Sequence, residues 1–142
     1  MWRPGVFCWA QWRAESGPAL RIFLLIVFGS AGTLARYALQ GWVQDQSGPS
    51  FPAGTLAVNV IGSFLLGCIG QFALDHLWVS PEWRVAITIG FFGAFTTFSS
   101  FGWETAHLLD SGEWMRAAIY AGASVLGGIV AVMLGMRLAE RI

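Results

Sequence analysis

A stretch of the third apolar segment, from Gly90 to Glu104, places hydroxyl side chains where a membrane-spanning helix would meet hydrocarbon. Its hydroxyl residues and the glycines that precede them are Gly90, Gly93, Thr96, Thr97, Ser99 and Ser100. Polar groups are not left unpaired at membrane depth, so this pattern is expected only where protein or a water-filled pathway takes them up. It predicts a break in the helix and an ion or solute site there. The alternative is a kinked helix in which the threonine hydroxyls bond the preceding turn.

Further neutral hydrogen-bonding groups lie in the second and fourth apolar segments. Asn59, near the middle of the second segment, offers two amide N–H donors. Tyr120 and Ser124 are four residues apart in the fourth segment, so their hydroxyls share one helix face. Such groups act either as donors to a bound ion or as hydrogen bonds between helices, which contribute roughly 0.6 to 2 kcal/mol in a bilayer.

Two phenylalanines follow the expected break at a spacing that puts them on one helix face. Phe98 and Phe101 are three residues apart. An aromatic ring has a positive edge as well as a negative face, so a ring presented edge-on can contact a small anion without a fixed charge. The same spacing is also typical of ordinary core packing, and the pair alone does not separate these interpretations.

Arg36 and Glu104 are the charged residues nearest the membrane interior, which makes each a functional candidate. Arg36 either raises the local anion concentration in an aqueous vestibule or extends its side chain to the interface. Glu104 either lines a pore mouth or pairs with a cation.

Four long apolar segments must position all of these residues. Of the 142 residues, 56% are hydrophobic and 11% are charged, whereas a soluble domain carries about 25% charge. The segments run from Leu20 to Val43, from Pro52 to Leu74, from Trp83 to Thr105 and from Trp114 to Met136. Each is near the ~20 residues that span a bilayer as a helix. The sequence predicts an all-α integral membrane protein of four transmembrane helices over residues 20–142, preceded by an N-terminal tail of residues 1–19.

Short connections between four helices place both chain ends on one side of the membrane. The arginines of that side are Arg3, Arg13, Arg21, Arg84, Arg137 and Arg141, and the other side carries Arg116. The positive-inside rule would put the ends in the cytoplasm, but most of these arginines belong to the tails, so the bias between the helices is weak. The tail of residues 1–19 has no continuous apolar run and does not resemble a signal peptide.

Three other classes of protein fit the residues less well than an ion or solute pathway does. The chain has no nucleophile, base and orienting group at a recognisable spacing and no metal-ligand cluster, so an enzyme is not expected. A small multidrug exporter is also a four-helix, often antiparallel protein, but it needs a proton-coupling carboxylate deep in the first helix, and this chain has none there. A non-conducting membrane assembly protein would not require polar residues to converge on a helix break.

Three motifs together resemble the Fluc (CrcB) family of fluoride channels. The first segment carries Gly29-x-x-Gly32-x-x-x-Arg36-Tyr37. The second carries Gly54-Thr-Leu-x-Val-Asn59-x-x-Gly62-x-Phe64-x-x-Gly67. The third carries Gly90-Phe-x-Gly93-x-x-Thr-Thr-Phe98-Ser-x-Phe101-x-x-Glu104. The resemblance covers the chain from about Gly29 to Met136.

The resemblance implies an antiparallel, dual-topology homodimer in the inner (plasma) membrane, with two narrow fluoride pathways. It also implies one structural Na⁺ on the twofold axis, held by the backbone carbonyls of Gly93 and Thr96. Fluoride would leave the cytoplasm down its electrochemical gradient.

The family's pathway residues map onto positions already singled out. Phe98 and Phe101 match the phenylalanines that enclose the anion, and Asn59 matches the pore asparagine. Tyr120 and Ser124 match the hydroxyl positions of the fourth helix, and Thr97, Ser99 and Ser100 extend the donor track. Arg36 matches the arginine near the end of the first helix and is assigned to the vestibule together with Glu104.

Overall fold

Four helical spans make up the part of the chain that this computed structural model describes, residues 17–76 and 79–141. Each is long and apolar enough to cross a membrane, which confirms the predicted all-α, multi-pass architecture. In chain order the elements are α1 (Pro18–Ser47), α2 (Ala53–Asp75), α3 (Pro81–Val85), the π-helix η2 (Ala86–Phe92), α4 (Gly93–Phe95), α5 (Phe98–Asp110) and α6 (Trp114–Ala139). The third span joins the elements from α3 to α5.

The helix starts follow local sequence. Pro18 opens α1 and Pro81 opens α3, where a proline costs nothing because the first N–H groups of a helix have no internal partner. The first helix therefore begins two residues before the predicted Leu20. Residues 1–16, most of the predicted N-terminal tail, lie outside the described residues.

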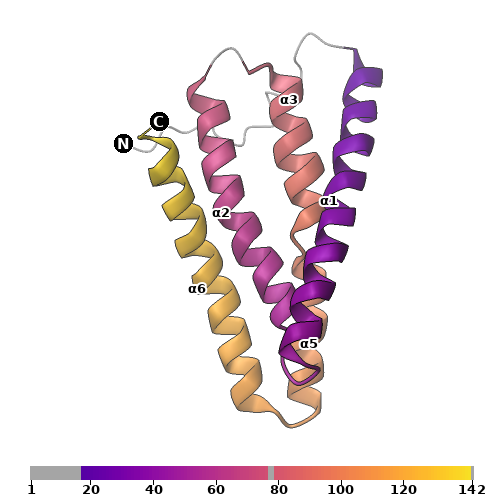
Figure 1. Ribbon diagram of the computed structural model, residues 1–142, viewed down its shortest axis with the longest axis vertical. Coiled ribbons are helices and arrows are strands. Elements are labelled where there is room, and N and C mark those ends of the chain that lie inside the picture. The colour runs from indigo at the N-terminus through magenta and orange to yellow at the C-terminus, as the bar shows by residue number, and fades with distance from the viewer. Residues whose placement is uncertain (1–16, 77–78, 142) are drawn as a thin grey trace.

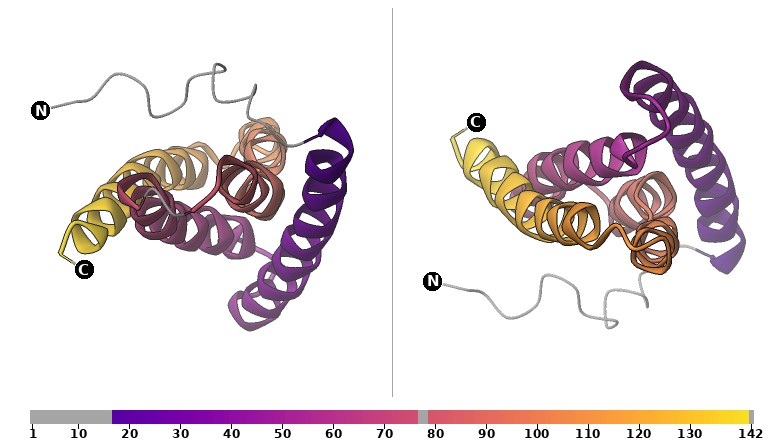
Figure 2. Two further views of the ribbon diagram at one scale, coloured as in Figure 1. Left: turned by 90° about the horizontal axis from the view of Figure 1, so that it is seen from above. Right: turned by 90° about the horizontal axis from the view of Figure 1, so that it is seen from below.

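The spans are arranged with α1 and α6 on opposite sides, and with α2 and the third span between them (Figures 1 and 2). The most extensive contact joins α2 to α6. It depends on Gly67 and Gly135, because a side chain on either glycine would collide with the backbone of the other helix. Small residues at such positions let helices approach closely in a bilayer. The third span packs mainly on α1.

Few large side chains are buried inside this single chain. Val58, Phe92 and Phe95 form the central apolar cluster, close to the end of α4. Many other large apolar side chains are exposed, as expected for a bundle whose outer surface faces lipid. Exposed tryptophans such as Trp42 and Trp114 lie near helix ends, where their amphipathic rings suit the membrane interface.

The third span is interrupted at Thr96 and Thr97, as predicted. Both residues are extended, with a ψ of 158° at Thr96 and a φ of −147° and ψ of 111° at Thr97. Thr97 then acts as the N-cap of α5, because its hydroxyl accepts the backbone N–H of Ser100 at 3.2 Å. The Thr96 hydroxyl donates to the Phe92 carbonyl at 2.9 Å, which is the bond to the preceding turn that a kinked helix would make. The backbone helix is therefore interrupted at both threonines, and the Thr96 hydroxyl also bonds a carbonyl of the preceding turn.

Candidate functional site

Asn59 and Thr97 join the middle of α2 to the break. The Asn59 side-chain amide donates to the Thr97 carbonyl at 3.1 Å, and the Asn59 Oδ1 accepts the Thr97 N–H at 2.8 Å. The amide oxygen thus takes the place of the Gly93 carbonyl for the Thr97 N–H, and the amide N–H adds a bond to the Thr97 carbonyl, the N-cap carbonyl of α5. One N–H of Asn59 is used in this pair, which leaves one of its two donors for another partner.

The break also frees backbone carbonyls, among them those of Gly93 and Thr96. In an uninterrupted α-helix the Thr97 N–H would bond the Gly93 carbonyl, and the Ser100 N–H would bond the Thr96 carbonyl. Here the first N–H bonds Asn59 and the second bonds the Thr97 hydroxyl. Gly93 and Thr96 are thus left with carbonyl oxygens whose usual donors are diverted. Such carbonyls at the end of a half-helix suit a small hard cation.

The hydroxyls of the break gather around Thr97. Its Oγ1 lies 3.0 Å from the Ser100 Oγ and 3.3 Å from the Ser99 Oγ. Thr97 is buried, Ser100 is half-buried and Ser99 is exposed on the surface of the single chain. The structure therefore brings together three of the predicted donors with Asn59.

The two predicted phenylalanines are neighbours, with ring centroids 5.5 Å apart and planes tilted by 45°. Phe101 also lies beside the Tyr120 ring at 5.4 Å. The Phe98 ring is 82% exposed in the single chain. One chain by itself does not enclose an ion between these rings.

Glu104 is held by hydroxyls from two other spans. The Thr55 hydroxyl donates to its Oε1 at 2.7 Å, and the Tyr120 hydroxyl donates to its Oε2 at 2.5 Å. Thr55 in turn accepts a hydrogen bond from the Gln40 amide at 3.1 Å. In this arrangement the Tyr120 proton is committed to Glu104. Neither Thr55 nor Gln40 was singled out from the sequence, although Thr55 lies one helical turn before Asn59 and so shares its face.

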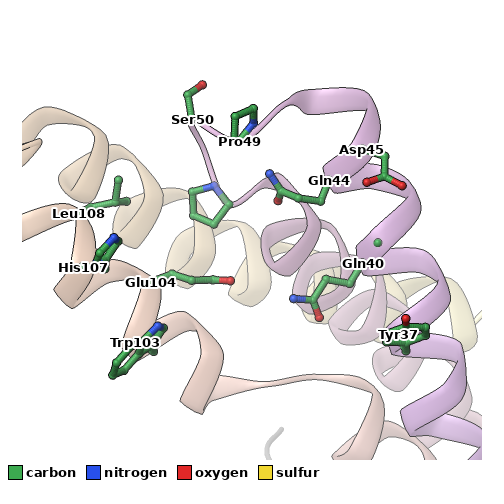
Figure 3. A pocket seen from close by; sticks show the side chains of 12 residues that line it. Tyr37, Gln40, Gln44, Asp45, Pro49, Ser50, Trp103, Glu104, His107 and Leu108 are labelled. Atoms are coloured by element: carbon green, nitrogen blue, oxygen red, sulfur yellow. The ribbon is translucent and has the colours of Figure 1, made fainter. Parts of the chain in front are cut away.

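A pocket of about 590 Å³ opens at the end of the bundle that carries the α1–α2 and α5–α6 connections (Figures 1 and 3). Gln40 and Glu104 extend toward one another across it, from α1 and α5. The side chains of Asp45 and His107 also line it. Arg36, the other predicted vestibule residue, is half-buried one turn before Gln40 and is not among the lining residues.

Ser124 carries a buried hydroxyl oxygen that has no hydrogen-bond partner among the described residues. It lies one turn beyond Tyr120 on α6, a helix that packs along α2. A buried hydroxyl without a protein partner is available to a group that the single chain does not supply. The described residues contain no group of three or more His, Cys, Asp or Glu side chains that could hold a metal. Backbone carbonyls remain the candidate cation ligands.

These features define a multi-pass membrane protein whose neutral donors and aromatic rings gather at an interrupted third span. The profile described as "CrcB-like protein, Camphor Resistance (CrcB)" matches residues 23–136, and the chain belongs to this family.

Curated relatives agree with this assignment. A Geotalea daltonii protein named fluoride-specific ion channel FluC is 47% identical over 121 residues, which cover 85% of this chain and 98% of that protein. Proteins of the same name from Geobacter metallireducens and Acidobacterium capsulatum are 46% and 44% identical, over 99% and 97% of their lengths and 87% and 84% of this chain.

Proposed function

We propose that this protein is a fluoride-selective channel that lets cytoplasmic fluoride leave the cell down its electrochemical gradient. The observation that carries the proposal is the junction of Asn59 with Thr97, where neutral donors from two spans meet beside aromatic rings. Membership of the CrcB family and the name of the relatives support the choice of anion. The protein is expected to act without enzymatic chemistry, in the inner (plasma) membrane.

Neutral donors suit fluoride because this ion is strongly hydrated. A selective path must replace the lost water with strong donors, yet must bind weakly enough to release the ion. The free N–H of Asn59, the hydroxyls of Ser99 and Ser100 and the unpartnered hydroxyl of Ser124 supply donors without a trapping charge. The edges of Phe98 and Phe101 add weak electrostatic stabilisation.

A structural Na⁺ fits two of the carbonyls that the break releases, those of Gly93 and Thr96. A hard cation prefers oxygen ligands, and the C-terminal end of a half-helix adds partial negative charge. When bound, the ion would supply a fixed positive charge at the break and would not be transported. Gly93 is exposed in the single chain, so this cation site needs further ligands from outside.

A second copy inserted antiparallel would complete both sites. The exposed ring of Phe98 and the exposed Gly93 lie on the same stretch of the chain and lack enclosure in one copy. A closed twofold dimer would present each stretch to its symmetry mate, which would give two anion pathways and one shared cation site. The weak arginine bias between the helices is compatible with insertion in both orientations.

Fluoride efflux from liposomes that contain the purified protein tests the proposal. Rapid fluoride release with chloride retained is expected, and Phe98→Ile and Asn59→Asp should each slow it. Vesicles that hold fluoride, or that release chloride equally fast, would overturn the channel assignment. Impermeable vesicles would instead favour a non-conducting assembly protein, and release only with a drug-like cation and a proton gradient would favour an exporter.

A further inference from the structure

A polar layer connects all four spans at the inner end of the pocket. Its members are Gln40 on α1, Thr55 on α2, Glu104 on the third span and Tyr120 on α6. Thr55 and Tyr120 are 1% and 0% exposed, whereas Gln40 and Glu104 line the pocket (Figure 3). The layer therefore joins two residues that line the pocket to two that are buried inside the bundle.

The hydrogen bonds of this layer have one consistent direction. The Thr55 hydroxyl has a single proton, which it donates to Glu104. Its oxygen can then only accept from Gln40, whose Nε2 group can only donate. The Gln40 amide consequently excludes directions of the Thr55 O–H group that point toward Gln40, and Glu104 accepts the proton. Donation into the Thr55 oxygen also polarises its O–H group, because hydrogen bonds in a chain strengthen one another.

The backbones of α1 and α2 lie close together beside Gln40 and Thr55. A side chain on Gly54 would collide with the Gln40 carbonyl oxygen, so α1 and α2 approach here as closely as a glycine allows. One turn deeper, on the same faces as Thr55 and Tyr120, lie Asn59 and Ser124. An anion that moved from the pocket toward Asn59 along these faces would meet the hydroxyls of the layer.

We infer that Gln40 is a positioning residue for anion selectivity, which acts by holding the Thr55 hydroxyl as a donor directed into the pathway. This inference rests on the proposed fluoride channel. When an anion takes the place of the Glu104 carboxylate as acceptor, a hydroxyl already aimed and polarised compensates for lost water. Fluoride depends on that compensation more than chloride does, because it is the more strongly hydrated ion.

The test is the ratio of fluoride to chloride efflux from one liposome preparation, which does not depend on the fraction of active protein. Gln40→Met keeps the length of the side chain and removes the donor. The ratio is expected to fall about fivefold, the size that follows from loss of one neutral hydrogen bond. Gln46→Met, on an exposed position of the same helix, is the matched control and should leave the ratio unchanged.

A double-mutant cycle with Thr55→Val shows whether Gln40 acts through Thr55. Once the Thr55 hydroxyl is absent, Gln40→Met should lower the ratio no further. Gln40→Glu keeps the size and replaces the donor with an acceptor, so it should also lower the ratio, and it serves if Gln40→Met does not fold. A selective wild type with unchanged ratios in the Gln40 variants would overturn this inference alone. A wild type that does not conduct fluoride would overturn the channel function and the inference with it.

Discussion

Asn59 and Thr97 exchange two hydrogen bonds across the interface between α2 and the third span, at 3.1 and 2.8 Å. The Asn59 amide oxygen therefore accepts the Thr97 N–H in place of the Gly93 carbonyl of the preceding turn. The same contact diverts the N–H that would bond Gly93, so the stability of the break and the release of a carbonyl have a single cause.

Asn59→Asp keeps the acceptor for the Thr97 N–H and removes the donor to the Thr97 carbonyl. The new carboxylate would face that carbonyl and repel an anion. Fluoride efflux is expected to fall below about a tenth of the wild-type rate, and the thermal midpoint in detergent should drop, since the lost amide hydrogen bond contributes roughly 0.5 to 1.5 kcal/mol. Gln71→Glu makes the same amide-to-acid change near the end of α2 and should preserve efflux. Wild-type conduction in Asn59→Asp would remove Asn59 from the pathway.

Ser124→Ala separates function from folding. The Ser124 hydroxyl oxygen is buried without a partner among the described residues, so its removal should leave thermal stability unchanged or raise it by about 1 kcal/mol. Fluoride efflux should nevertheless slow several-fold if this hydroxyl serves the ion. A variant that is less stable but conducts normally would show that the serine has a packing role only.

Phe98→Ile removes a ring that is 82% exposed in the single chain. We expect at least about a tenfold loss of fluoride efflux, which corresponds to roughly 1.4 kcal/mol of lost stabilisation of the passing ion. Phe23→Ile, at a position 61% exposed on α1, makes the same change far from the break in sequence. Equal efflux in both variants would contradict a role for the Phe98 ring.

Thr97→Val removes the side chain that caps α5. It also removes the hydroxyl that the Ser99 and Ser100 hydroxyls contact. Loss of such a cap costs about 1 kcal/mol, so the thermal midpoint should fall. Thr105→Val removes only a hydroxyl bond to the Phe101 carbonyl within α5 and should be close to neutral. Calorimetry or fluorescence-monitored melting of both variants in the same detergent compares them, and similar midpoints would argue against the cap as a stabilising element.

Sodium should stabilise the assembly through backbone oxygens. If the Gly93 and Thr96 carbonyls hold Na⁺, the free energy of dissociation should rise by about 1.4 kcal/mol for each tenfold increase in Na⁺ above its dissociation constant. Dimer fraction and melting in Na⁺ or in a bulky organic cation would measure this. Thr96→Val retains the carbonyl and should keep the dependence. If Thr96→Val no longer responded to Na⁺, the hydroxyl and not the carbonyl of Thr96 would be the ligand. If the stability of the wild type did not depend on Na⁺, the proposed cation site would be wrong.

Much of this architecture is predictable from the chain alone. Apolar length fixes the four spans, and two threonines in the middle of one of them mark the break because their hydroxyls and extended backbone compete with the helix. Asn59 could be assigned to the same region because a lone amide at membrane depth needs a polar partner.

Other features depend on how the helices are rotated against each other. The sequence does not indicate that Gln40 would meet Thr55, since that contact joins two helices through a close approach at Gly54. The commitment of the Tyr120 proton to Glu104 is likewise a tertiary property. Arg36 and Glu104 were both assigned to the vestibule, and of the two only Glu104 lines the pocket, which depends on how α1 is rotated.

The interlocked glycines Gly67 and Gly135 have a mechanical consequence. Because backbone meets backbone there, α2 and α6 form a stiff wall with little room to slide. We therefore expect the movement that admits an ion in α1 and in the two halves of the third span, which the two extended threonines join.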